Sequence, residues 1–132
     1  MSFMAINTWA VILAAVAGFA FGAVWYGVLG KPWMAALGKS AESFKPASGT
    51  FILAFFSQLV MAAMLAGVIG HLGVSDISGS LLAVFLLWLG FVVTTLMVNH
   101  RFQQASWSLT IIDAGHWLGV MLAMAVVISL FG

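Results

Sequence analysis

The chain has 132 residues, of which 64% are hydrophobic and only 5% are charged, and its formal net charge is +1. Soluble domains carry about 25% charged residues and disordered chains are strongly polar, so both classes are excluded. A net charge of +1 also provides no surface that neutralises phosphates, which excludes nucleic acid as a partner. The composition therefore predicts an integral membrane protein whose main partner is the lipid bilayer.

The hydrophobic pattern predicts one all-α domain over residues 1–132, an integral membrane bundle of four transmembrane helices arranged as two hairpins. Continuous apolar runs cover about residues 7–29, 50–70, 79–99 and 107–131. A spanning helix needs about 20 apolar residues, and each run is long enough. The strands of a β-barrel would instead alternate apolar and polar residues over about 10 positions, which this sequence does not do.

The segment after the first span is expected to lie on the inner membrane surface. Pro32 cannot continue a helix that needs its N–H, so the first span is expected to end just before it. Residues 32–38 have the pattern of a short amphipathic turn, and Gly38 is suited to ending it. Four aromatic residues near span boundaries are interpreted as interfacial anchors: Trp9, Tyr26, Trp33 and Trp107.

The basic side chains predict the orientation of the bundle. Lys31, Lys39 and Lys45 fall in the loop 31–49, and Arg101 falls in the loop 100–106. These two loops share one side of a four-span bundle, and the positive-inside rule makes that side cytoplasmic. Both termini are therefore expected outside.

Small residues recur every four positions in two of the spans. Gly18 and Gly22 form such a pair in the first span, and Gly115 and Gly119 form another in the fourth. In lipid, small residues mark places where helix backbones approach closely. Two interpretations stay open: these residues pack helices within one chain, or the Gly18 and Gly22 stripe joins two copies in a homodimer.

Asp113 is the one carboxylate expected inside a span, and His116 follows it on the same helical face. An Asp at a helix centre costs about 2.5–3.5 kcal/mol to insert, so it is a candidate functional residue. One reading is structural, with Arg101 or Asn99 as a partner of the carboxylate. The other is a transport role in which Asp113 and His116 exchange a proton. Gln58 is a further mid-span polar group, expected to hydrogen-bond between helices.

The remaining polar groups give little sign of a metal, a cofactor or an enzyme. Asn99, His100 and Arg101 form a polar cluster at the inner face, either a solvated loop or a contact with lipid head groups. His71, His100 and His116 are expected at depths that differ by about half a membrane each, so no metal or cofactor is expected. No nucleophile-plus-base motif is present, so an enzyme acting on lipids or quinones is the least favoured class.

Three stretches resemble a known bacterial family of small four-span membrane proteins, domain of unknown function 1761. They are Phe21-Gly22-Ala23-Val24-Trp25-Tyr26 with the following Gly30-Lys31-Pro32-Trp33-Met34, then Trp88-Leu89-Gly90-Phe91, and Ile112-Asp113-Ala114-Gly115-His116-Trp117-Leu118. The resemblance implies a bacterial inner-membrane location and no known activity. Family members often have Asn at the position of Asp113, so the resemblance argues against an essential proton-carrying role for this residue.

Two hypotheses for function follow. The first is a structural or accessory inner-membrane protein, either a homo-oligomer (dimer or higher) or part of a larger membrane complex. The second is a small oligomeric transporter or channel in which Asp113 and His116 form a polar or proton-linked site. A cavity that reaches either residue would favour the second hypothesis.

Overall fold

The structure, a computed structural model, describes residues 6–132, and this range is helical with no strand in it. The helices are α1 (Thr8–Val28), α2 (Gly30–Leu37), α3 (Ser48–Leu72), α4 (Ile77–Leu87), α5 (Thr94–Phe102) and α6 (Trp107–Phe131), with a π-helical stretch, η2 (Trp88–Val93), joining α4 to α5. Four helices, the third running from α4 through η2 to α5, are long and apolar enough to cross a membrane. The prediction of an all-α bundle with four membrane-crossing helices is confirmed. The ends of these helices lie within three residues of the ends of the apolar runs.

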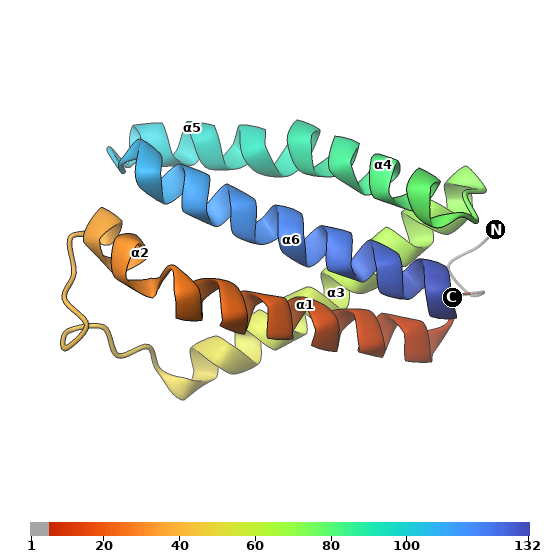
Figure 1. Cartoon of the computed structure of the whole chain (residues 1–132), viewed down its shortest axis with the longest axis horizontal. Coiled ribbons are helices and arrows are strands. Elements are labelled where there is room, and N and C mark those ends of the chain that lie inside the picture. The colour runs from red at the N-terminus through yellow and green to blue at the C-terminus, as the bar shows by residue number, and fades with distance from the viewer. Residues whose placement is uncertain (1–5) are drawn as a thin grey trace.

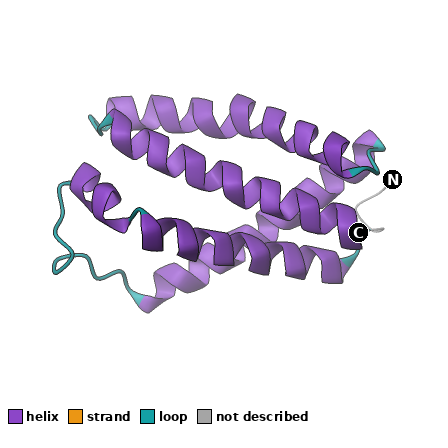
Figure 2. Cartoon of the chain, in the orientation of Figure 1, coloured by secondary structure: helices purple, strands orange, loops and turns teal. Residues whose placement is uncertain are grey.

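Helix α6 lies at the centre of the bundle. Figure 1 shows α6 between α1 on one side and the α4–α5 span on the other, with α3 crossing behind, and α6 contacts every other helical element. The core contains Val120 and Met124 of α6, Ala14 of α1 and Val84 of α4, all with no exposed surface. The helices are joined by short connections, apart from the longer loop between α2 and α3 (Figure 2).

The glycines of α1 and α6 allow these two helices to pack closely. Each of the four predicted glycines faces a side chain of another helix in the same chain: Gly18 faces Gln58, Gly22 faces His116, Gly115 faces Trp25 and Gly119 faces Phe21. A Cβ atom added at any of them would lie 2.0–2.8 Å from that side chain, well inside a normal contact. The face carrying Gly18 and Gly22 is therefore occupied within one chain, and the structure offers it to no second copy.

The backbone breaks between α1 and α2 at Leu29. Pro32 has no N–H to donate to the carbonyl of Val28, and Val28 is the last residue of α1. The chain resumes as α2 at an angle to α1 (Figure 1). Gly38 ends α2 with a left-handed φ of 73°, as expected, and its amide donates to the carbonyl of Ala35. The expected surface turn is thus a helix of 8 residues that begins at Gly30.

The third span lies at the edge of the bundle and contains a wide π-helical turn at η2. The Thr94 hydroxyl donates to the Gly90 carbonyl at 2.8 Å, and Thr95 donates likewise to Phe91. These bonds stay inside the span, although hydrogen bonds to other helices are the more usual role of such residues in membranes. Only 6% of the most apolar part of this span is buried, against 39% for α6.

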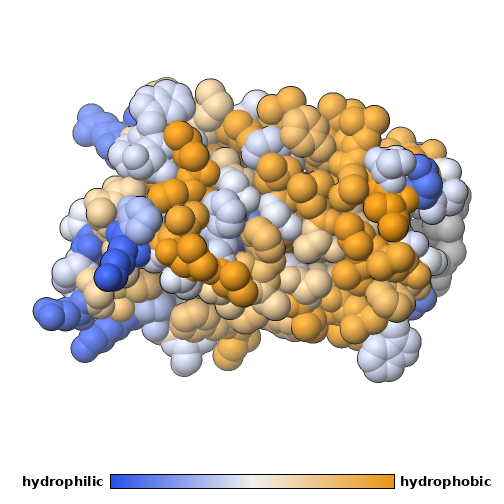
Figure 3. Space-filling model, viewed as in Figure 1, coloured by the Kyte–Doolittle hydropathy of each residue, from blue (hydrophilic) through white to orange (hydrophobic). Residues whose placement is uncertain are grey.

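The two ends of the bundle differ in charge. Lys31 lies in α2, Lys39 and Lys45 lie in the connection after it, and Arg101 lies near the end of α5, so all four basic side chains share one end. Figure 3 shows hydrophilic groups gathered there, with an apolar surface over most of the remaining length. At the opposite end the Asn7 side-chain amide donates to the Phe131 carbonyl at 2.9 Å, which ties α1 to α6.

Candidate functional site

The carboxylate of Asp113 joins three helices. The Tyr26 hydroxyl at the end of α1 donates to Oδ1 of Asp113 at 2.6 Å, and the indole Nε1 of Trp33 in α2 donates to the same oxygen at 3.0 Å. The break at Leu29 makes this possible, because it turns α2 toward α6 and brings Trp33 to Asp113. Oδ1 of Asp113 therefore accepts two hydrogen bonds, one from α1 and one from α2.

A row of polar groups approaches the other carboxylate oxygen. His100 is buried, and its Nε2 lies 3.9 Å from Oδ2 of Asp113, beyond hydrogen-bond distance but within that of an ion pair. Its Nδ1 lies 2.8 Å from the Thr110 hydroxyl, which accepts a hydrogen bond from Nη2 of Arg101 at 2.7 Å. When Thr110 gives its one proton to Nδ1, the ring proton of neutral His100 lies on Nε2 and faces Asp113.

His116 lies one turn deeper along α6 and is buried among aromatic rings. Its ring centroid is 4.7 Å from that of Tyr26 and 4.6 Å from that of Trp117. Nδ1 of His116 is buried and has no hydrogen-bond partner among residues 6–132. An imidazole with a free nitrogen beside a carboxylate can bind a ligand or exchange a proton.

A pocket of about 380 Å³ reaches both Asp113 and His116. Aromatic side chains dominate its lining: Tyr26, Trp33, Phe44, Phe51 and Trp117, with Pro46, Thr50 and Ala54 completing it beside the two polar residues. The rings of Phe44, Trp33 and Tyr26 contact one another in sequence, with centroids 5.0 and 5.1 Å apart. We name this cavity the Asp113 pocket.

Asn99, His100 and Arg101, the polar cluster expected at the inner face, have different surroundings in the structure. Arg101 does not pair with Asp113. It donates to Thr110 and to the Ala105 carbonyl, and its guanidinium lies 3.6 Å over the ring of Trp107. His100 lies inside α5, which continues to Phe102, so the expected loop from residue 100 starts too early. Asn99 makes no side-chain hydrogen bond to Asp113 or to any other described residue.

The expected depth of His100 was also wrong. His100 and His116 are not separated by half a membrane. Nε2 of His100 lies 3.9 Å from Oδ2 of Asp113, and Asp113 precedes His116 by only three residues of α6, about one helical turn. Within residues 6–132 no three His, Asp or Glu side chains are grouped to hold a metal ion.

Sequence reasoning missed the donors that surround Asp113. Tyr26 and Trp33 were interpreted as lipid anchors, whereas both donate to the carboxylate. Two further indoles hold the same turn of α6 through its backbone: Trp25 donates to the Ile112 carbonyl at 3.0 Å, and Trp88 donates to the Ala114 carbonyl at 2.8 Å. The one available signal was that these aromatics fall in the stretches that carry the family resemblance.

Gln58 does not belong to the Asp113 pocket. It is buried in α3, its Oε1 has no hydrogen-bond partner among the described residues, and it lies against Gly18. The expected hydrogen bond between helices is therefore not seen at Oε1. Gln58 fills the close contact between α1 and α3.

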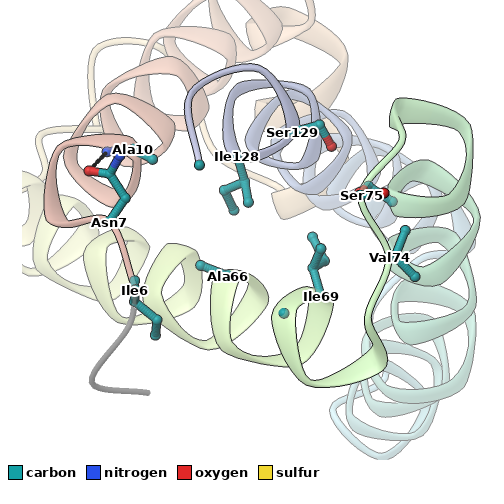
Figure 4. A pocket seen from close by; sticks show the side chains of 12 residues that line it. Ile6, Asn7, Ala10, Ala66, Ile69, Val74, Ser75, Ile128 and Ser129 are labelled. Carbon is teal, nitrogen blue, oxygen red and sulfur yellow. Dashed lines mark hydrogen bonds between the residues drawn. The ribbon is translucent and has the colours of Figure 1, made fainter. Parts of the chain in front are cut away.

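A second pocket of about 220 Å³ lies at the opposite end of the bundle (Figure 4). Ile69 of α3 and Ile128 of α6 face it, and Asn7 borders it beside the start of α1. Its lining includes the buried hydroxyls of Ser80 and Ser129 and no ionisable side chain. Of these two pockets, only the Asp113 pocket is lined by ionisable side chains.

The fold and the site define a small membrane protein of four spans with a hydrogen-bonded carboxylate in an aromatic pocket. The chain matches the family described as Protein of unknown function (DUF1761) over residues 9–129. It belongs to that family, as the sequence stretches indicated. No curated protein and no solved structure matches the chain.

Proposed function

We propose that the chain is a carrier that binds a small molecule in the Asp113 pocket and exchanges protons at Asp113. The pocket supports this proposal, because it reaches both residues singled out as a polar or proton-linked site. A volume of about 380 Å³ falls in the range of about 300–1,000 Å³ that is typical of small-molecule sites. A mainly apolar lining with few polar groups is also typical of such sites.

The row of groups from Arg101 to Asp113 supports the proton-linked part of the proposal. Ionisable residues inside a span commonly mark ion and proton pathways. His100 lies between the Thr110 hydroxyl and the carboxylate, and Thr110 lies beside Arg101 near the end of α5. In this proposal protons reach Asp113 along this row from the end of the bundle that carries the lysines.

The packing favours a carrier over an open channel. Val120 and Met124 lie on α6 between the residues that line the two pockets, and both are fully buried. This apolar layer separates the Asp113 pocket from the pocket at the opposite end. A ligand therefore crosses only when the helices rearrange, which is how carriers alternate access.

We further propose a bacterial inner-membrane location with both termini outside and with the segments 31–49 and 100–106 on the cytoplasmic side. The gathering of all four basic side chains at one end supports this orientation through the positive-inside rule. We also propose that the chain forms a homo-oligomer or joins a larger membrane complex through the third span, which lies at the edge of the bundle. Its exposed apolar side chains meet either lipid or a protein neighbour.

One observation favours a second candidate, a structural or accessory function. The two hydrogen bonds to Oδ1 make Asp113 a clip between α1, α2 and α6, and a clip needs no ligand. Under this candidate the Asp113 pocket is filled by lipid acyl chains and has no specific ligand. The two candidates differ in whether any compound stabilises the protein through Asp113.

A thermal-unfolding screen in detergent micelles separates the two candidates. The screen uses cationic, neutral and anionic amphipathic compounds on wild type and on Asp113→Asn. A ligand at about 100 times its Kd stabilises the folded state by about 2.7 kcal/mol, which raises the Tm by several degrees. The carrier proposal expects at least one compound that raises the Tm of wild type and not that of Asp113→Asn.

Asp76→Asn is the matched control, because it removes the same charge at the exposed N-cap of α4, away from the pocket. The control is expected to respond to compounds as wild type does. A screen in which no compound distinguishes Asp113→Asn from Asp76→Asn would refute ligand binding and leave the structural function. For a compound that passes, proton movement in proteoliposomes with an internal pH dye tests the carrier step.

A further inference from the structure

The lining of the Asp113 pocket points to one chemical class of ligand, a hydrophobic organic cation, and we infer that this is what the pocket binds. The inference rests on the proposed function and deepens it. The carboxylate of Asp113 is the only acidic side chain in the lining, and neither Lys nor Arg belongs to it. The pocket is therefore a negative site with apolar walls.

The aromatic rings add a second attraction for positive charge. A cation over the face of Trp, Tyr or Phe is attracted by the ring quadrupole, and the attraction is stronger when the cation is desolvated. Phe44, Trp33 and Tyr26 form a connected row beside Asp113, and the ring of Trp117 contacts that of His116. Several rings around one carboxylate match a cation whose charge is spread over an apolar body.

The hydrogen-bond count leaves the carboxylate able to accept a cation. Both donors, Tyr26 and Trp33, bind Oδ1, whereas Oδ2 has no hydrogen bond within residues 6–132 and lies 3.9 Å from Nε2 of His100. His116 also lines the pocket, and its buried Nδ1 has no hydrogen-bond partner among residues 6–132. A neutral ligand would leave the Asp113 charge without a counter-ion in a largely apolar site, which is costly.

The lysines near the pocket offer the opposite reading, an anionic ligand. Lys45 lies between Phe44 and Pro46, which both line the pocket, but Lys45 itself does not line it. An anion inside the pocket would lie beside the Asp113 carboxylate. The geometry therefore assigns the cation to the pocket and leaves the lysines at the membrane surface.

Tetraphenylphosphonium and tetraphenylborate test the inference, because they share a shape and differ in the sign of charge. Binding to the full chain in lipid nanodiscs is measured by calorimetry, with empty nanodiscs subtracted. Wild type and Asp76→Asn are expected to bind tetraphenylphosphonium, and Asp113→Asn is expected to lose about tenfold or more in affinity. Tetraphenylborate is expected to show no saturable binding that depends on Asp113.

A second pair of variants keeps the test decisive where Asp113→Asn fails to fold. Phe51 lines the pocket and is 55% exposed, and Phe56, one and a half turns along α3, is 65% exposed and lies outside the lining. Both rings are largely exposed, so truncation at either site is expected to leave the fold intact. Phe51→Ala is expected to weaken tetraphenylphosphonium binding several-fold, and Phe56→Ala is expected to leave it unchanged.

The outcomes distinguish the inference from the proposed function. In one outcome, tetraphenylborate or a neutral compound binds in a way that depends on Asp113 or Phe51, while tetraphenylphosphonium does not bind. That result would overturn the inference of a cationic ligand but would keep the proposal of a ligand-binding pocket. Equal binding of tetraphenylphosphonium to all variants means partition into the bilayer and overturns the inference. If no compound of any charge depends on these residues, the inference and the proposed function fall together.

Discussion

Gly119→Ala tests whether the close contact of α1 with α6 holds the bundle together. The added Cβ would lie 2.0 Å from Cζ and 2.1 Å from Cε1 of Phe21. Carbon atoms in contact prefer about 3.5–4.0 Å, so the Phe21 ring must withdraw by about 1.5 Å. Withdrawal is restricted, because this ring stacks on Trp25 at 5.8 Å, and Trp25 itself lies against Gly115.

Gly27→Ala isolates the packing cost of that substitution. Gly27 lies in α1, and a Cβ there would meet nothing within 4 Å. Both substitutions replace a helical glycine by alanine, so the gain in helix propensity cancels between them. The difference in unfolding free energy between the two variants is then the cost of overpacking. Gly119→Ala is expected to be less stable than Gly27→Ala by about 1–3 kcal/mol.

The assay is reversible unfolding in mixed detergent micelles with increasing sodium dodecyl sulfate, followed by far-ultraviolet circular dichroism. Equal stability of Gly119→Ala and Gly27→Ala would refute the reasoning, because the α1–α6 contact would then not be as close as described. The double variant Gly119→Ala with Phe21→Leu gives a further check. The smaller side chain at position 21 is expected to relieve part of the overpacking caused by Gly119→Ala. The double variant should therefore be more stable than the sum of the two single changes predicts, by at least about 0.5 kcal/mol of coupling energy.

Three further predictions concern single side chains. Tyr26→Phe removes the 2.6 Å hydrogen bond to Asp113 and is expected to cost about 1.5–3 kcal/mol in the same unfolding assay. Gly38→Ala places a side chain at a φ of 73° and is expected to cost about 1–2 kcal/mol. Asp76→Ala removes the N-cap of α4, so the variant is expected to have a lower unfolding free energy than wild type at neutral pH but not in strong acid. Hydrogen bonds from the Ser78 hydroxyl and the Gly79 amide hold the pKa of Asp76 below its usual range, so its contribution is present above about pH 4 and is lost as the pH falls through that lowered value.

Each of these predictions has a contrasting variant or outcome. A Tyr26→Phe protein as stable as wild type would mean that the hydrogen bond to Asp113 contributes nothing to the fold. Gly38→Asn is expected to cost less than Gly38→Ala, since Asn tolerates the left-handed region. Asp76→Asn keeps a capping oxygen and is expected to remove the pH dependence without most of the loss. A difference between wild type and Asp76→Ala that persists unchanged in strong acid would contradict the cap.

The spans and the candidate residues could be predicted from the sequence, whereas the partners of those residues could not. Apolar length alone determines where helices cross the bilayer, and Pro32 and Gly38 determine where α2 begins and ends. Asp113 and His116 were found because a polar residue in an apolar run is conspicuous. Their neighbours depend on how helices distant in sequence pack, which no local pattern encodes.

Tyr26 and Trp33 show why the partners were missed. An amphipathic aromatic side chain near a span boundary has the same pattern whether its polar atom faces head groups or a buried carboxylate. The direction of α2 after the break at Leu29 determines that the indole of Trp33 faces the carboxylate and not the head groups. This direction is a consequence of tertiary packing. Arg101 shows the converse, since charge alone favoured a pair with Asp113, but the guanidinium lies over Trp107 and binds Thr110.

The central position of α6 has a consequence for the order of assembly during synthesis. Ribosomes deliver α1 to α5 before α6, yet α6 is the helix that contacts all of them. Until α6 enters the bilayer, Tyr26 and Trp33 lack the carboxylate to which they donate, and Gly22 faces no imidazole. Before α6 arrives, α1 and α3 can already pack against each other, but the hydrogen bonds to Asp113 and the α1–α6 contact form only with the last helix, after insertion, as in two-stage folding of membrane proteins.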